Sequence, residues 1–198
     1  TARKAPACEA TAQELTAQFA GECIALPIDI STVAGAEQLA AAFKAREQRL
    51  DILVNNAGAA WAAAFDEFPE SGWDKVVDLN LKAPFFITKA LAAPLRAAAS
   101  AARPAKVINI ASIDGIFINP LETYPYAASK AGLIHLTRRM AARLIADHIA
   151  VSAIAPGAFG SEMNRAARDN AEGVARRVPA RRVGTIEDIA GTAIYLAS

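Results

Sequence analysis

Short apolar runs alternate along this chain with longer stretches whose apolar residues are spaced like one face of a helix. Three of the runs, residues 51–54, 106–110 and 149–154, are rich in isoleucine and valine and show little polar alternation. Such runs indicate strands buried on both faces, as in a parallel sheet that helices cover. Residues 22–30 predict a further strand, in which Pro27 would lie near an end or on an edge.

In the longer stretches, apolar residues recur three or four positions apart, as at Leu133, Leu136, Met140 and Leu144. This period predicts helices. They are expected at residues 4–20, ending at Gly21; from Ser31 or Thr32 to about residue 49; at 72–102, divided by Pro84 and Pro94; at 126–148; and after Thr185. Residues 161–182 are polar and arginine-rich, which predicts a mobile surface segment.

Helices and strands that alternate in this way predict the α/β class, with a Rossmann-like, doubly wound parallel sheet and helices on both faces. The 198 residues suffice for one domain and are too few for two, so we expect residues 1–198 to form a single domain. Ligands of such sheets bind beyond the carboxyl ends of the strands. Asp29, Asn56, Ser112 and Pro156 all follow expected strands.

The composition argues against several classes of function. A formal net charge of +1 gives no basic field for nucleic acid, and no apolar run reaches the roughly 18 residues of a membrane span. The two cysteines, Cys8 and Cys23, and the two histidines, His135 and His148, are too isolated for a disulfide framework or a metal site. We therefore expect a cytoplasmic protein with no metal, nucleic-acid partner or membrane contact.

Tyr126 and Lys130 form the most informative pair of polar residues. They lie four positions apart in an expected helix and therefore share one face. A neighbouring ammonium favours the phenolate, so we expect Lys130 to lower the tyrosine pKa from about 10. Such a phenol can exchange a proton with an alcohol or carbonyl oxygen near working pH. The pair alone is common enough to arise by chance.

Together with other polar residues, this pair resembles the short-chain dehydrogenase/reductase family over essentially the whole chain. The elements that carry the resemblance are the N-N-A-G sequence at 55–58, Asn80 in L-N-L, Ser112, the Y-x-x-x-K pair Tyr126 and Lys130, and the P-G segment of Pro156 and Gly157 with Ser161. Each element is weak alone, and their order and spacing together are specific.

The resemblance implies an NAD(P)-dependent oxidoreductase that transfers a hydride between NADP(H) and a carbonyl or secondary alcohol. Tyr126 would exchange a proton with the substrate oxygen, and Ser112 would donate a hydrogen bond to that oxygen. Lys130 would lower the tyrosine pKa and bind the nicotinamide ribose. Asn80 would hold a water that links Lys130 to solvent.

The resemblance also implies a cofactor site. Arg3 ends the expected second strand of the family, where an arginine accommodates a 2′-phosphate and an acidic residue would bind a ribose hydroxyl. We therefore expect NADP(H) to be preferred, with NAD(H) possible as cofactor. The other residues expected to contact it are Asp29, Ile30, Asn56, Ala57, Gly58, Tyr126, Lys130, Pro156, Gly157, Phe159 and Ser161.

The expected substrate pocket is mainly apolar. Its borders would be Ser112, Ile113, Asp114, Phe117, Tyr126, Phe159 and Met163, with Asp114 as one possible polar contact. Such a pocket fits a 3-oxoacyl thioester, a polyol or sugar, or a hydrophobic ketone. By family analogy we expect a homotetramer, or a homodimer, formed through the helices at 72–102 and 126–148.

Three departures from the family pattern stand out. The sequence contains no glycine-rich phosphate loop, and it ends before the family's last strand, so we expect these residues to be part of a longer polypeptide. The loop between Ser112 and Tyr126 is one residue longer than usual. A non-catalytic NAD(P)-binding regulatory protein on the same fold and a sugar-nucleotide epimerase remain as alternatives.

Overall fold

The computed structural model describes residues 1–198 and is built around a three-stranded parallel sheet. Its strands are β1 (Ile52–Asn55), β2 (Ala105–Ile110) and β3 (Ile149–Ile154), in the order β1-β2-β3. The register pairs Leu53 with Val107 and Val107 with Val151. The three apolar runs therefore form the expected strands.

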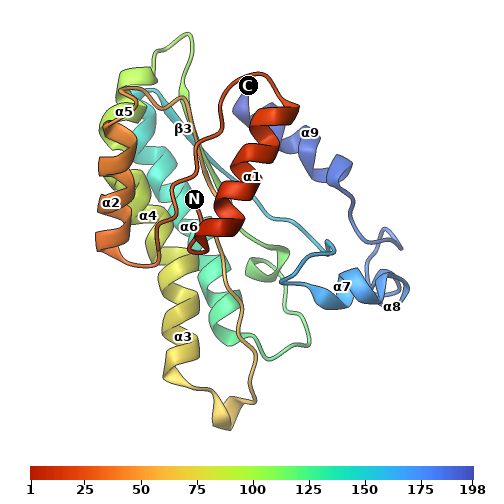
Figure 1. The fold of residues 1–198 in the computed structure, drawn as a ribbon. Coiled ribbons are helices and arrows are strands. Elements are labelled where there is room, and N and C mark those ends of the chain that lie inside the picture. Colours follow the sequence, from red (N-terminus) through yellow and green to blue (C-terminus); the bar gives the residue numbers. More distant parts are fainter.

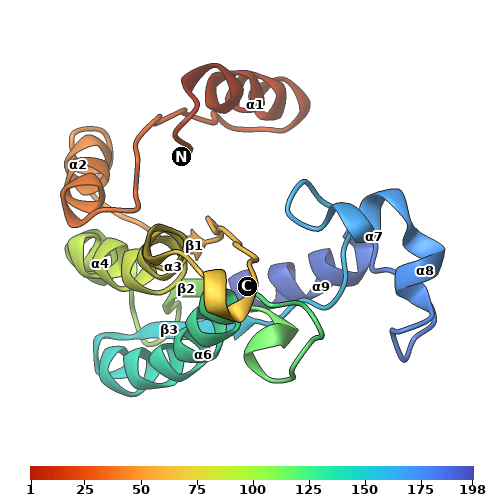
Figure 2. The same cartoon turned by 90° about the horizontal axis from the view of Figure 1, so that it is seen from below.

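Helices cover both faces of this sheet (Figures 1 and 2). One face carries α4 (Ala83–Ala90), α5 (Ala92–Ala98) and α6 (Tyr124–Leu144), with α2 (Val33–Lys44) packed against α4. On the opposite face, α9 (Ile186–Ala197) contacts β2 and β3. The remaining helix on that side, α1 (Ala5–Gln18), is set apart from the others in Figure 2 and buries only Ala12. This arrangement is the predicted Rossmann-like fold.

Two apolar clusters make up the core. The first joins α2 to α4 and contains Ile28, Ile30, Ala36, Leu39, Ala40, Ala83, Ile87 and Leu91. The second joins the sheet to α5 and α6 and contains Leu95, Ala98, Ala105, Val107, Met140, Ile149 and Val151. Both clusters lie on the face of the sheet that α4, α5 and α6 cover. Burial in the second cluster holds β2 and α6 in a fixed relation.

A chain of buried polar side chains crosses the sheet between these clusters. The Asn55 amide on β1 donates to Thr88 Oγ1 on α4 at 3.3 Å and to Asn109 Oδ1 on β2 at 2.9 Å. Asn109 Nδ2 in turn donates to Thr137 Oγ1 on α6 at 2.9 Å. Because buried polar groups are costly without partners, this chain fixes the sheet and its two covering helices in one register.

Residues 22–30 do not form the expected strand. They are extended, and Ile28 and Ile30 are buried, but no neighbouring strand lies beside them to complete a ladder of hydrogen bonds. The expectation that residues 51–54 are buried on both faces is also wrong. Ile52 and Val54 are 41% and 51% exposed, because β1 is an edge strand and α9 reaches only β2 and β3.

The long helical stretch is divided as predicted. It comprises α3 (Glu70–Val77), a π-helical turn at Asp78–Lys82, then α4 and α5. Pro84 and Pro94 lie in the first turns of α4 and α5, where a missing N–H is tolerated. The π-helical turn was not predicted, and it carries Asn80.

The arginine-rich segment is more regular than predicted, because it contains α7 (Arg165–Asp169) and α8 (Ala171–Ala175). The side chains of Asn164 and Asn170 cap these two helices, which supplies a local reason for them to form. Single 3₁₀ turns occur at Phe65–Glu67, Ile113–Gly115 and Ile145–Asp147. Thr185 and Asp188 form a capping box at the start of α9, as the sequence indicated for Thr185.

Replacing Thr137 by valine tests the buried polar chain. The change leaves Asn109 Nδ2 without its acceptor in a site where both residues are buried, so we expect a loss of about 1–3 kcal/mol in the free energy of unfolding. Urea unfolding followed by circular dichroism measures it. Thr11→Val is the matched control, since Thr11 makes the same hydroxyl-to-carbonyl bond within an exposed helix. Equal losses in the two variants would contradict a role for the buried chain.

Candidate active site

The polar residues singled out in the sequence gather at the carboxyl end of the sheet. Asn56 follows β1, Ser112 follows β2 and Pro156 follows β3. The first turns of α6, which begins at Tyr124, place Tyr126 and Lys130 beside the end of β2. The structure therefore brings these residues together at the carboxyl edge of the sheet, where the sequence predicted the site.

Tyr126 and Lys130 share one face of α6, as their spacing indicated. The Lys130 ammonium nitrogen lies 5.7 Å from the centre of the Tyr126 ring. It donates a hydrogen bond of 2.6 Å to the carbonyl oxygen of Ile110, the last residue of β2. Lys130 is 4% exposed, so this buried cation is bound to the strand and not to the phenol oxygen.

Burial dominates the titration of both groups. It raises the pKa of the Tyr126 phenol above its ordinary value; hydrogen bonding with Ser112 acts the other way, and the Asp114 charge raises the pKa further. Burial lowers the pKa of Lys130 to about 8. The Tyr126 pKa is therefore raised and not lowered as expected: burial dominates it, and Lys130, whose ammonium donates to Ile110, is not among the groups that shift it.

Asn80 is fully buried in the π-helical turn, and its side chain is committed to two neighbours. Its Oδ1 accepts from the N–H of Ala59 at 2.8 Å, and its Nδ2 donates to the Ala59 carbonyl at 2.9 Å and to Ser129 Oγ at 3.1 Å. Ser129 Oγ donates to the Tyr126 carbonyl at 2.9 Å. Asn80 thus holds the loop after β1 against the first turns of α6.

The sequence reasoning missed Ser129 and the carbonyl of Ile110. A signal for Ser129 existed, because it lies three residues after Tyr126 on a helix and is therefore turned toward the same side. The Ile110 carbonyl carries no sequence signal, since any residue would supply it.

Gly58 and Met163 lie beside these residues. A Cβ atom placed on Gly58 would be 3.3 Å from Asn80 Oδ1, 3.8 Å from Lys130 Nζ and 3.7 Å from the Met163 methyl carbon. The loop after β1, the catalytic helix and the segment after β3 therefore meet at this point. Met163 is half-exposed.

The loop that follows Ser112 is seated against α6. A Cβ atom on Gly115 would lie 2.6 Å from the Lys130 carbonyl carbon, so only glycine permits this approach. Ser112 is buried, and its Oγ accepts from the N–H of Asp114 at 3.2 Å. Asn119 Nδ2 donates to Asp114 Oδ2 at 2.6 Å, and burial raises the pKa of this carboxyl. The Asp114 charge acts on the Tyr126 phenol and raises its pKa. One oxygen of the Asp114 carboxyl is already bonded to Asn119.

Three of the residues expected to contact the cofactor, Arg3, Asp29 and Ile30, belong to the N-terminal part of the chain. The N–H and hydroxyl of Ser31 donate to Asp29, which lowers the pKa of Asp29, and the nearby Arg3 guanidinium lowers it further. Arg3 is exposed. The Ile30 side chain is packed in the core, so only its backbone is left for a ligand.

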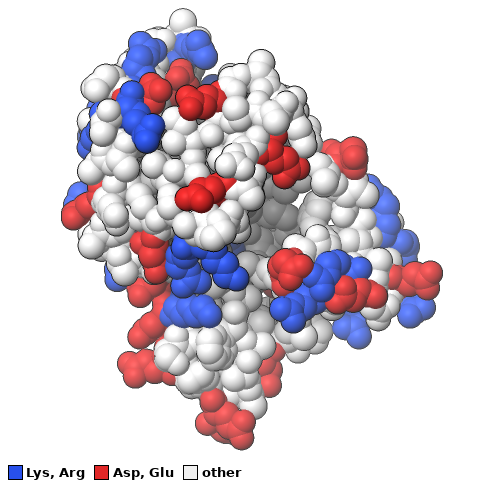
Figure 3. Space-filling view, in the orientation of Figure 1, with Lys and Arg blue, Asp and Glu red and all other residues white.

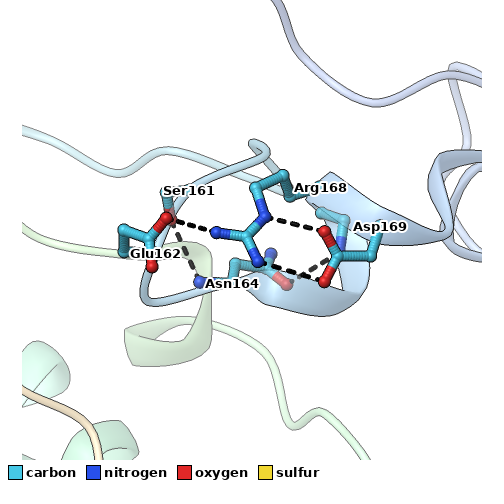
Figure 4. A network of polar contacts seen from close by, with 6 residues as sticks. Ser161, Glu162, Asn164, Arg168 and Asp169 are labelled. Atoms are coloured by element: carbon cyan, nitrogen blue, oxygen red, sulfur yellow. Dashed lines mark hydrogen bonds and ion pairs between the residues drawn. The ribbon is translucent and has the colours of Figure 1, made fainter.

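The segment after β3 is held by its own contacts. The backbones of Phe159 and Gly184 form an isolated β-bridge. The Phe159 ring packs against Gly184, where the sequence had suggested that it contacts a cofactor or substrate. Ser161 Oγ accepts from the N–H of Asn164 at 3.0 Å. Arg168 pairs with both Glu162 and Asp169 (Figure 4). Gly157 is exposed, with no atom close to where a side chain would lie.

The surroundings of the site add little further chemistry. No group of three His, Cys, Asp or Glu side chains is placed to hold a metal ion. Cys8 and Cys23 are free thiols, and His135 and His148 are exposed. Positive and negative side chains are interspersed on the face drawn in Figure 3. None of the helices combines the length and apolar character needed to cross a bilayer.

Comparison with known proteins agrees with this geometry. The profile of the short chain dehydrogenase family matches residues 1–172. The rhamnolipids biosynthesis 3-oxoacyl-(acyl-carrier-protein) reductase of Pseudomonas aeruginosa is 44% identical over 199 residues, which cover 99% of this chain and 77% of that protein.

Solved structures show the same likeness. The Pseudomonas aeruginosa RhlG/NADP active-site complex superposes with a TM-score of 0.94 at 44% identity, covering 100% of this chain and 77% of that one. A gluconate 5-dehydrogenase from Burkholderia cenocepacia, in complex with NADP and tartrate, gives 0.86 at 32% identity, covering 99% and 76%. The chain belongs to the short chain dehydrogenase family and is an NAD(P)-dependent oxidoreductase that acts on CH–OH groups.

Proposed function

We propose that this protein transfers a hydride between NADP(H) and a carbonyl or secondary alcohol, with Ser112, Tyr126 and Lys130 as its reacting and binding groups. The observation that carries the proposal is the meeting of these three residues at the carboxyl end of β2. Ser112 adjoins the Tyr126 phenol, and the Lys130 ammonium lies 5.7 Å from its ring. Residues brought together from a strand end and a helix supply all the donors that a carbonyl oxygen needs.

In the direction of reduction, NADPH would supply the hydride to the carbonyl carbon when bound. Ser112 donates a hydrogen bond that fixes the substrate oxygen, where a misplacement of about 1 Å costs on the order of a hundredfold in rate. The Tyr126 phenol, kept protonated by burial, gives its proton to that oxygen. Lys130, whose ammonium nitrogen lies 5.7 Å from the centre of the Tyr126 ring, is proposed to bind the nicotinamide ribose.

Asn80 acts in this scheme as a positioning residue. Both hydrogens of its amide are donated, to Ala59 and Ser129, so only one lone pair on Oδ1 is left for a water. The expected water link to Lys130 would have to use that lone pair. We propose that the main effect of Asn80 is to hold Ala59 and the first turns of α6 at a fixed distance.

NADP(H) is the proposed cofactor. The residues fit a dinucleotide with a 2′-phosphate, because the exposed Arg3 stands beside Asp29 and the backbone of Asn56 and Ala57 is accessible after β1. A guanidinium suits a phosphate, whereas no acidic residue stands in its place to select NAD(H). The two solved relatives described above contain NADP, which supports the same choice.

The relatives leave two substrate classes open. One acts on 3-oxoacyl-(acyl-carrier-protein), and the other is a gluconate 5-dehydrogenase. A non-catalytic NAD(P)-binding protein is disfavoured, because a protein that only binds the cofactor has no need of Ser112 beside a buried phenol. The N-N-A-G and P-G elements favour a simple reductase over an epimerase.

We further propose that residues 1–198 act as one dinucleotide-binding and catalytic unit within a homotetramer or homodimer. A groove between α4 and α6 supports self-association: Phe85, Leu136 and Met140 line it, with Arg139 and Arg143 beside them. A cytoplasmic location agrees with the free thiols of Cys8 and Cys23.

Replacing Tyr126 by phenylalanine tests the proposed acid. We expect kcat for NADPH-dependent reduction to fall by about 10²–10⁴, the usual contribution of general acid–base catalysis. Tyr124→Phe is the matched control, since its phenol lies two residues away and bonds to Glu122 at the surface. NADPH absorbance against a panel of ketones measures both. Equal turnover by Tyr126→Phe and the unaltered enzyme would refute the assignment.

Replacing Arg3 by alanine tests the cofactor choice. Loss of the guanidinium is expected to lower kcat/KM for NADPH by about tenfold or more, as for a charge-assisted bond, and to leave the value for NADH nearly unchanged. Lys4→Ala provides the control, because Lys4 is the adjacent exposed cation. Comparable kcat/KM values for the two cofactors in the unaltered enzyme would contradict the proposal.

A further inference from the structure

The loop that joins Ser112 to Tyr126 carries large apolar side chains that residues 1–198 leave exposed. Its four most exposed apolar residues are Ile116, Phe117, Ile118 and Leu121, at 59%, 65%, 101% and 68% exposure. We call these four residues the apolar lip. Exposed apolar residues that cluster beside a site mark a binding surface, whereas single ones need no explanation.

The apolar lip is continuous with the reacting groups. It begins four residues after Ser112 and ends five residues before Tyr126. The N–H groups of Ile116 and Phe117 both donate to the Ile113 carbonyl at 2.9 Å, so the chain turns at once after the serine. The close approach of Gly115 to the backbone of Lys130 fixes this turn against α6. The apolar lip therefore starts from a turn that is packed against the helix of Tyr126 and Lys130.

The charges around the loop select against an anionic substrate. Residues 113–125 contain Asp114 and Glu122 and no lysine or arginine. Across the site, Met163 adds a half-exposed apolar side chain. In the segment after β3, Arg168 is paired with Glu162 and Asp169 (Figure 4). A sugar acid would meet like charge and few free hydrogen-bond partners, because Asn119 occupies one oxygen of Asp114.

Resting on the proposed reductase function, we propose that the apolar lip binds the unbranched aliphatic tail of an uncharged carbonyl substrate. The substrate class is then a 3-oxoacyl compound of medium or long chain, and not a keto-sugar acid. The carbonyl lies between Ser112 and Tyr126, and the tail runs outward over Ile116 and Phe117. Each methylene fully removed from water favours binding by about fourfold, and on an open surface we expect about twofold.

The test is a chain-length series of 3-oxoacyl N-acetylcysteamine thioesters, from butanoyl through hexanoyl and octanoyl to decanoyl, with 5-keto-D-gluconate as the anionic competitor. NADPH consumption gives kcat/KM for each. We expect kcat/KM to rise by about twofold per methylene along the series. We expect 5-keto-D-gluconate to be turned over less efficiently than any of the thioesters.

A matched pair of variants locates the effect. Ile116→Ser removes part of the apolar lip, and Ile145→Ser removes an equally exposed isoleucine at the far end of α6; the two are 59% and 60% exposed. Ile116→Ser is expected to flatten the rise with chain length, lowering kcat/KM for the decanoyl thioester more than for the butanoyl thioester. Ile145→Ser is expected to reproduce the unaltered series.

Each contrary outcome has a distinct meaning. Reduction of the butanoyl thioester that depends on Tyr126, with a flat response to chain length, would overturn the tail site and leave the reductase assignment intact. If kcat/KM did not change with chain length and Ile116→Ser abolished self-association, the apolar lip would be a contact with a second copy of the chain. That result would overturn the proposal. Preference for 5-keto-D-gluconate would also overturn it. No NADPH consumption with any carbonyl compound would refute the proposed function itself.

Discussion

The hydrogen bond from the Lys130 ammonium to the Ile110 carbonyl is the contact on which the arrangement of the site depends. It joins the catalytic helix α6 to the carboxyl end of the central strand β2 over 2.6 Å. A buried cation is costly unless it is hydrogen-bonded, so this bond fixes where the helix can sit against the sheet. The Thr137–Asn109 bond on the same helix, farther from the strand's carboxyl end, fixes the second point of attachment. Tyr126 and Ser112 are held in place between rigid elements as a result.

Burial of the site also determines that the Tyr126 phenol keeps its proton. With the ammonium turned to Ile110, the phenol is left in a poorly solvated place beside Asp114, and its pKa rises. A phenol that keeps its proton is suited to protonating a carbonyl oxygen as hydride arrives. The acidic and apolar loop around Asp114 suits an uncharged substrate for the same reason, because an anion there would be repelled. The protonation state of the phenol and the proposed preference for an uncharged substrate thus follow from one set of surroundings.

How much the sequence could predict depends on whether a feature is local. The strands β1, β2 and β3 and the pairing of Tyr126 with Lys130 on one helix face follow from short periodic patterns. Residues 22–30 have the composition of a strand and are not one, because a strand also needs a neighbour. The π-helical turn at Asn80, the Ser129 bridge and the raised Tyr126 pKa arise from contacts between distant segments. Spacing along the chain can place Ser129 on the side of Tyr126, but it does not show which distant residue lies opposite.

The most direct test of this account is a titration of the Tyr126 phenol itself. With tyrosine labelled at the ring carbon that bears oxygen, carbon NMR follows Tyr124, Tyr126 and Tyr195 separately, and Tyr126→Phe identifies the signal. In the protein alone the account predicts a pKa above the ordinary value of about 10, so the phenol stays protonated throughout the neutral range and ionises only in strong alkali. A Tyr126 signal that titrates at or below that ordinary value would show that Lys130, and not burial, governs the phenol, and would contradict the account.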